Sequence, residues 1–129
     1  MERKKILIVE DDRTTLYVLT AMLERAGYAV VVCEDGQTAL ALVKEQRPDL
    51  VLTDALIPRM HGFLLSKAIK ALPDPPKVIL LTAVYTNLKY RLGSNSDYEA
   101  DDYLKKPIEE GELVSCIRKH LSPPSSSER

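Results

Sequence analysis

Residues 4–16 read KKILIVEDDRTTL, and this stretch decides how the rest of the chain is interpreted. Four aliphatic residues at positions 6–9 are followed directly by three acids, Glu10, Asp11 and Asp12. An uninterrupted aliphatic run is typical of a strand buried on both faces of a parallel sheet. Carboxylates clustered at its end are unfavourable, because each raises the cost of ionising the others. Three acids at the end of a buried strand therefore indicate a functional or structural role at that position.

Similar runs recur and alternate with segments of helical periodicity. Strands are predicted at residues 6–9, 28–33, 49–53, 77–82 and 101–106. The first four runs lack polar alternation, so we expect them to be buried on both faces. Helices are predicted at residues 13–26, 37–47, 61–72 and 109–121. This alternation predicts an α/β fold with a doubly wound, five-stranded parallel sheet.

Two segments depart from the pattern. The fourth helical segment lies in YTNLKYRLGSNSDYEA (residues 85–100), whose Gly-Ser-Asn-Ser portion has loop composition, so a short or irregular fourth helix is expected. Residues 122–129, SPPSSSER, have no apolar content and are interpreted as a Pro/Ser-rich tail or linker. The folded domain is therefore expected to span residues 1–121.

Composition excludes several classes of protein. The chain has 129 residues, 45% of them apolar and 29% charged, with a formal net charge of −1. This balance does not predict direct nucleic-acid binding, and no apolar run is long enough for a membrane helix or a signal-peptide core. Cys33 and Cys116 have no metal-ligand spacing and are expected to be reduced thiols in a cytoplasmic protein. His61 and His120 are both expected at the surface.

Polar side chains follow four of the five predicted strands. In open parallel sheets, functional residues gather at the carboxyl ends of the strands. The residues delivered there are Glu10, Asp11 and Asp12 after the first strand, Asp54 after the third, Thr82 and Ala83 after the fourth, and Lys105, Lys106 and Pro107 after the fifth. If the first and third strands are neighbours, the carboxylates meet in one pocket, flanked by a hydroxyl and an ammonium group.

Clustered, ionised carboxylates are suited to a hard divalent cation, and Mg²⁺ fits best. A carboxylate beside Mg²⁺, a hydroxyl and a lysine is also suited to phosphoryl transfer, with the carboxylate as nucleophile. Asp12 is better explained as the N-cap of the first helix.

The chain resembles the receiver domains of two-component response regulators, the CheY-like superfamily. The resemblance covers essentially residues 4–121 and rests on four motifs in order, which are ILIVEDD, RPDLVLTDALIPRMHG, VILLTA and DDYLKKP. It implies a flavodoxin-like (βα)5 fold with strand order 2-1-3-4-5.

The resemblance also implies roles for the acidic residues. Asp54 matches the phospho-accepting aspartate, with Pro58 four residues and Gly62 eight residues after it. Asp11 matches a direct ligand of Mg²⁺, and Glu10 a ligand acting through water. The backbone carbonyl of Leu56 matches the third protein ligand.

Other positions match the family's switch. Thr82 matches the hydroxyl that contacts the phosphoryl group, and Ala83 the small residue that leaves the acceptor accessible. Lys106, rather than Lys105, matches the lysine before a usually cis proline, here Pro107. Tyr103 matches the aromatic residue whose rotamer follows phosphorylation.

These roles imply a function in signalling rather than an enzyme. A sensor histidine kinase or phosphotransfer protein would donate a phosphoryl group to Asp54, and the domain would then control a downstream output domain or protein. Two alternatives remain open. One is a receiver-like docking module that takes no phosphate, and the other is a haloacid-dehalogenase-like phosphatase, which Glu10 and Asp12 superficially fit but which leaves Asp54 unexplained.

Overall fold

The computed structural model describes residues 3–60, 62–82 and 100–121. The elements follow one another in the order β1 (Lys5–Val9), α1 (Arg13–Arg25), β2 (Ala29–Cys33), α2 (Gly36–Gln46), β3 (Leu50–Asp54), α3 (Gly62–Lys70), β4 (Lys77–Thr82), β5 (Asp102–Lys105) and α5 (Glu110–His120). The predicted strands and helices are confirmed within one or two residues at most ends. The expected fourth helix and the tail at residues 122–129 lie outside the described residues.

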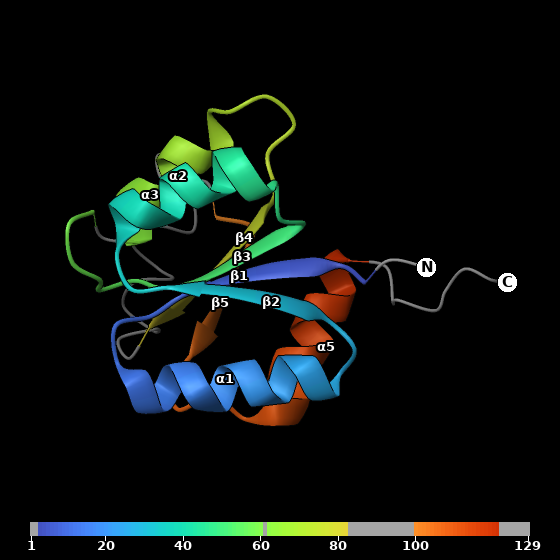
Figure 1. The fold of residues 1–129 in the computed structure, drawn as a ribbon. Coiled ribbons are helices and arrows are strands. Elements are labelled where there is room, and N and C mark those ends of the chain that lie inside the picture. Colours follow the sequence, from blue (N-terminus) through green and yellow to red (C-terminus); the bar gives the residue numbers. More distant parts are fainter. Residues whose placement is uncertain (1–2, 61, 83–99, 122–129) are drawn as a thin grey trace, which may run out of the picture.

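The five strands form one parallel sheet in the order β2-β1-β3-β4-β5, as the resemblance implied. Helices α1 and α5 cover one face and α2 and α3 the other (Figure 1). Because all strands run in the same direction, their carboxyl ends lie at one edge of the sheet. The register places Val9 opposite Thr53, Asp54 opposite Leu81, and Thr82 opposite Lys105.

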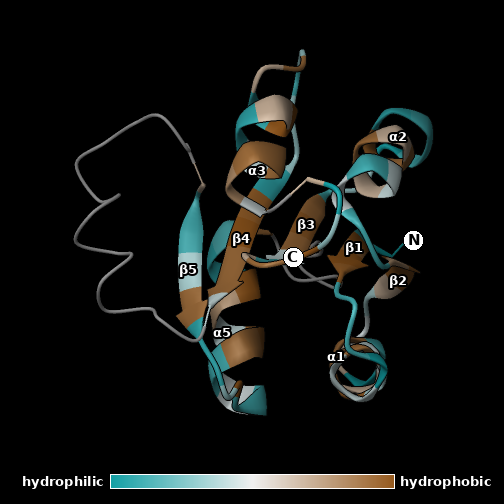
Figure 2. Ribbon diagram, turned by 90° about the vertical axis from the view of Figure 1, so that its left-hand side faces the viewer, coloured by the Kyte–Doolittle hydropathy of each residue, from teal (hydrophilic) through white to brown (hydrophobic). Residues whose placement is uncertain are grey.

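The core consists of two aliphatic layers, one on each face of the sheet. Alternate strand residues supply each layer, so that Ile6 and Ile8 face α1 and α5 while Leu7 and Val9 face α2 and α3. The central strands β3 and β4 each contain an uninterrupted hydrophobic stretch, whereas β5 begins hydrophilic (Figure 2). This two-sided burial explains why β1, β3 and β4 have uninterrupted aliphatic sequences.

The expectation of full burial was wrong for β2. Only Cys33 of this strand is buried, and Val32 is 43% exposed. The physical reason is position, since β2 pairs with β1 on one side only and forms an edge of the sheet. An aliphatic run is therefore compatible with an edge strand as well as with a central one.

Side-chain caps fix where the helices begin. The carboxylate of Asp12 accepts hydrogen bonds from the backbone N–H of Thr15 (2.9 Å) and from its hydroxyl (2.6 Å), which confirms Asp12 as the N-cap of α1. Asp35 caps α2 in the same way through Thr38. Each cap satisfies a backbone donor that the first helical turn leaves without a partner.

Candidate functional site

Three carboxylates meet at the carboxyl edge of the sheet. Glu10 directly follows β1 and Asp54 ends the neighbouring strand β3, while Asp11 lies at the start of the loop that leads to α1. One carboxylate oxygen from each of the three residues lies within 4.8 Å of the others. The sequence prediction that these acids share one site is therefore confirmed.

Lys106 is the cation of this site. Its Nζ donates hydrogen bonds to Oδ2 of Asp54 (2.6 Å) and to Oε1 of Glu10 (3.2 Å). The backbone positions the side chain, because the Lys106 N–H donates to the carbonyl of Thr82 at 3.0 Å. The peptide bond between Lys106 and Pro107 is cis, as the resemblance implied. Lys105 is exposed instead, so Lys106 is the lysine of the pair that contacts the acids.

The three acids differ sharply in burial. Glu10 is 1% exposed and Asp54 9% exposed, whereas Asp11 is exposed to solvent. Burial, helped by the negative charge of Asp54, raises the pKa of Glu10, although the Asp12 N–H and Lys106 act in the opposite direction. The Asp12 N–H donates to Oε2 of Glu10 at 3.0 Å, so both oxygens of this buried carboxylate have partners.

The electrostatic balance also acts on the lysine. Burial lowers the pKa of Lys106, but the hydrogen bond and charge of Asp54, with Glu10, outweigh burial and leave the pKa above its usual value. The ammonium group is therefore held in its charged form between the two carboxylates. An ammonium group so placed is available to neutralise further negative charge at Asp54.

A tight backbone contact shapes the loop beyond Asp54. The N–H of Leu56 donates to Oδ1 of Asp54 at 3.0 Å, and the N–H of Gly62 donates to the carbonyl of Ala55 at 2.9 Å. A Cβ at Gly62 would lie 2.5 Å from the carbonyl oxygen of Asp54 and 2.8 Å from Cα of Ala55. Glycine is thus required here for close packing against the strand that carries the acid.

Three other predicted residues are described by the structure. Thr82 ends β4 and is 2% exposed, and Tyr103 lies in β5 opposite Leu80, partly buried. Leu56 is 72% exposed, next to the acids. Ala83 lies outside the described residues. The site therefore contains, from four strand ends, the carboxylates, hydroxyl and ammonium group that the sequence predicted.

The donor set fits a magnesium ion. All three acidic residues offer hard carboxylate oxygens, the ligands that Mg²⁺ prefers, and the exposed Asp11 leaves one side of the cluster open to the waters that Mg²⁺ retains. Each residue would offer the ion a carboxylate oxygen, Glu10 from the buried side of the site and Asp11 from its exposed side.

A comparison with known sequences identifies the family. The sequence profile of the response regulator receiver domain matches residues 6–118. The chain belongs to this family. As a receiver domain, it is a signalling domain of two-component response regulators with a phosphorylation-accepting, CheY-like fold. This finding decides against the haloacid-dehalogenase-like alternative.

Relatives of this receiver domain include whole transcriptional regulators. The chain is 39% identical over 119 residues to the DNA-binding response regulator MtrA of Mycobacterium tuberculosis, covering 92% of this chain and 51% of MtrA. It is 41% identical over 114 residues to the transcriptional regulatory protein CpxR of Escherichia coli, covering 88% of this chain and 47% of CpxR. The chain thus spans about half the length of these curated relatives.

Solved structures give the same result. The receiver domain of the sensor histidine kinase PA1611 from Pseudomonas aeruginosa superposes with a TM-score of 0.83 at 29% identity, covering 92% of this chain and 98% of that one. That structure has a magnesium ion coordinated in its active site cleft. The chemotaxis response regulator CheY4 of Vibrio cholerae superposes with a TM-score of 0.84 at 25% identity, covering 93% of this chain and 100% of that one.

A second cluster of polar side chains was missed by sequence reasoning. The expectation that His120 is a surface residue was wrong, because its side chain is only 16% exposed and its Nε2 lies 2.9 Å from Oδ2 of Asp102. The thiol of Cys116 donates to the same oxygen at 3.5 Å. The spacing of Cys116 and His120, four residues apart on a helix, was the available signal. His61 lies outside the described residues.

Within residues 3–60, 62–82 and 100–121, no helix has both the length and the apolar character needed to cross a bilayer.

Proposed function

We propose that this receiver domain accepts a phosphoryl group on Asp54 from the phosphohistidine of a sensor histidine kinase or phosphotransfer protein. The observation that carries the proposal is the contact of Lys106 with both Asp54 and Glu10 in a pocket that also contains Asp11. Asp54 is the central acid of this group, since it lies at the end of the middle strand of the sheet.

The transfer step is a substitution at phosphorus. A carboxylate oxygen of Asp54 attacks the phosphorus atom in line, a P–O bond forms, and the P–N bond to the histidine breaks with its electron pair returning to the imidazole nitrogen. Transfer adds negative charge close to Glu10, which is buried and already has a raised pKa. Lys106 offsets that charge, and because its ammonium group already contacts Asp54, little reorganisation is needed.

Glu10, Asp11 and Asp54, with the backbone carbonyl of Leu56, are the residues that would hold Mg²⁺. When bound, the ion would neutralise charge on the phosphoryl oxygens during transfer. The chain's own residues set the geometry of this site. Leu56 fixes Oδ1 of Asp54 through its N–H, and the Asp12 N–H fixes Oε2 of Glu10, so the carboxylates are oriented before an ion binds.

Phosphorylation would change the conformation through Thr82, Ala83 and Tyr103. The hydroxyl of Thr82 would approach the new phosphoryl oxygens, Ala83 would leave space for them, and Tyr103 on the adjacent strand would follow the movement. Moving a two-state equilibrium from 1:99 to 99:1 requires roughly 5.5 kcal/mol of differential stabilisation, so several such contacts have to act together.

The same proposal covers the wider context of the domain. Residues 1–121 form the receiver, and residues 122–129 are a linker to an output domain or partner, which is consistent with a chain that spans about half of MtrA and CpxR. The receiver does not itself bind nucleic acid, and it works in the cytoplasm, where Cys33 and Cys116 stay reduced. Its chemistry is limited to its own phosphorylation and dephosphorylation.

Intact-protein mass after incubation with acetyl phosphate tests the acceptor. Wild type is expected to gain one phosphate in the presence of Mg²⁺ and none without it, and Asp54→Asn is expected to gain none. Asp74→Asn is the matched control, because it makes the same chemical change at an exposed loop residue outside the site and should be labelled like wild type. Equal labelling of Asp54→Asn would refute the assignment. A folded wild type that takes no phosphate would favour the docking module.

A further inference from the structure

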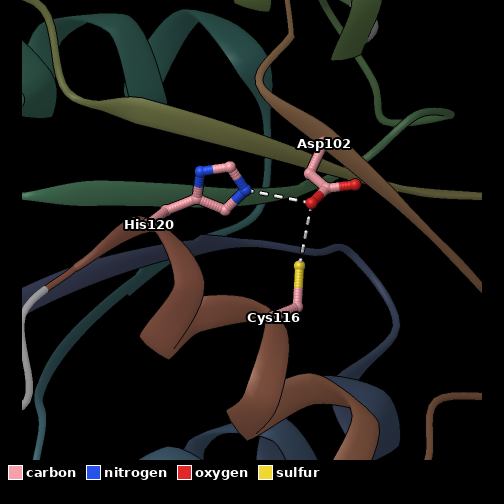
Figure 3. Close-up of side chains that lie close together, drawn as sticks. All are labelled: Asp102, Cys116 and His120. Carbon is pink, nitrogen blue, oxygen red and sulfur yellow. Dashed lines mark hydrogen bonds and ion pairs between the residues drawn. The ribbon is translucent and has the colours of Figure 1, made fainter.

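A cluster of three metal-ligating side chains lies at the other end of β5 from Lys106. Asp102 begins β5, and Cys116 and His120 lie one turn apart in the last part of α5. Figure 3 shows the three side chains pointing toward one another, with the carboxylate of Asp102 between the thiol and the imidazole. One ligand atom of each residue lies within 4.8 Å of the others.

We propose that Asp102, Cys116 and His120 form a binding site for Zn²⁺, with one coordination position left for water. A set of one sulfur, one imidazole nitrogen and one carboxylate oxygen suits zinc, whereas the all-oxygen set at Glu10, Asp11 and Asp54 suits magnesium. The proposed site is independent of phosphorylation at Asp54, and its metal would not compete for the same ligands.

Two of the three separations between the ligand atoms, those from Asp102, are close to those of a zinc centre, and the third lies within 4.8 Å. A tetrahedral zinc ion with bonds of about 2.0–2.3 Å holds its ligand atoms roughly 3.3–3.8 Å apart. Here Oδ2 of Asp102 lies 3.5 Å from Sγ of Cys116 and 2.9 Å from Nε2 of His120. Two protons now occupy the contacts that the ion would replace. Binding of the ion would widen the separation between Asp102 and His120, which is shorter than in a zinc centre.

The surroundings give an ion access to this cluster. The side chains of Asp102 and His120 are 20% and 16% exposed, and Cys116 is 8% exposed. A surface hollow of ≈ 290 Å³ adjoins Asp102 and Cys116 and is also lined by Ser115 and Lys119. This hollow supplies both a path for the ion and space for a water ligand.

The competing cation at this site is Lys119, whose Nζ lies 3.2 Å from Oδ2 of Asp102. Its side chain is 67% exposed, so it can turn into solvent when an ion binds. The hollow also contains Glu112, whose negative charge favours a cation there. The net charge of the pocket with Lys119 turned away is therefore negative.

Two other uses of the Cys116 thiol are disfavoured. A disulfide with Cys33 is excluded by the fold, since the two cysteines are free and belong to core layers on opposite faces of the sheet. A role as nucleophile is disfavoured because burial and the neighbouring Asp102 raise the pKa of the thiol to about 12. A metal ion can displace a thiol proton when it binds, so the protonated thiol is compatible with ligation.

Cobalt is a suitable probe, because Co²⁺ replaces Zn²⁺ and its thiolate complexes absorb strongly in the near ultraviolet. The full chain is titrated with Co²⁺ in excess Mg²⁺, which occupies the oxygen site. Wild type and the control Cys33→Ser should give a saturable thiolate-to-cobalt band that Zn²⁺ abolishes, whereas Cys116→Ser should give none. His120→Gln should weaken binding at least about tenfold, since even outer-shell changes at metal sites cost that much.

A thiolate band that persists in Cys116→Ser, or no band in folded wild type at saturating Co²⁺, would overturn the proposal. Should Cys116→Ser fail to fold, the X-ray absorption spectrum of the wild-type zinc complex identifies the ligands of the ion. One sulfur and one imidazole per zinc are expected, and a shell without sulfur contradicts the site.

Discussion

Lys106 Nζ lies 2.6 Å from Oδ2 of Asp54, although 52 positions separate the two residues in the chain. The contact exists because β3 and β5 both end at the same edge of the sheet, with β4 between them. The same ammonium group reaches Glu10, which directly follows β1, so one side chain links the ends of three strands.

Replacing Lys106 removes the only cation that contacts these acids among the described residues. Without Mg²⁺, Lys106→Ala should lower the free energy of unfolding by about 1–3 kcal/mol, because it leaves two buried carboxylates without their cation. This value is below the usual cost of breaking a buried ion pair, since the lysine side chain is 26% exposed and solvent screens its charge. Urea unfolding measures this. Added Mg²⁺ should stabilise the variant more than wild type. The control is Lys105→Ala at the exposed neighbouring lysine, which should change neither the free energy of unfolding nor its increase with Mg²⁺.

The adjacent acids Asp11 and Asp12 should respond differently to the same substitution. Asp11→Asn removes a proposed ligand and should raise the Mg²⁺ concentration needed for half-maximal labelling by about tenfold, equivalent to about 1.4 kcal/mol of binding free energy. Asp12→Asn should leave it nearly unchanged, since asparagine caps a helix as well as aspartate does. Equal shifts in both variants would contradict the division of roles.

Gly62 tests the close packing of the loop behind Asp54. Gly62→Ala should destabilise the protein by about 1–3 kcal/mol, because the added Cβ would overlap the backbone of Asp54 and Ala55. The control is Gly111→Ala in α5, whose added Cβ would be no closer than 3.4 Å to the side chain of Glu109. That variant should be stabilised by about 0.5–1 kcal/mol, because alanine is the better helix former. Urea midpoints of the two variants should move in opposite directions.

The cap of α2 predicts a pH-dependent contribution to stability. The Thr38 N–H lowers the pKa of Asp35 below its ordinary value of 3.8, burial opposes this, and the Thr38 hydroxyl adds to the lowering. A lowered folded-state pKa contributes stability above the unfolded value, and this contribution is lost as the pH falls through the folded pKa. The Tm difference between wild type and Asp35→Ala should therefore shrink below about pH 4. Asp35→Asn, which caps without charge, should show no such loss.

Much of the site could be predicted because short stretches of sequence determine where strands end and where helices are capped. The run ILIV followed by acids, and the aspartate after LVLT, each predict a strand that delivers carboxylates to one edge. The Asp12 cap could be predicted from its place before a periodic segment. Choosing Lys106 over Lys105 needed the resemblance, because spacing alone does not say which lysine points inward.

The surroundings of His120 and the exposure of β2 could not be predicted in this way. The burial of His120 depends on Asp102, 18 positions earlier, and on the packing of α5 against the sheet. The exposure of β2 depends on which strand forms the edge, and its aliphatic sequence resembles that of central strands. In both cases the deciding information is tertiary.

The most direct test of the central claim is to locate the phosphoryl group. Wild type treated with acetyl phosphate and Mg²⁺ is reduced with borohydride, which converts an aspartyl phosphate to homoserine, and the peptides are sequenced by mass spectrometry. We predict homoserine at position 54 and unmodified Glu10, Asp11 and Asp12. Reduction at one of those three acids, with Asp54 intact, would contradict the account.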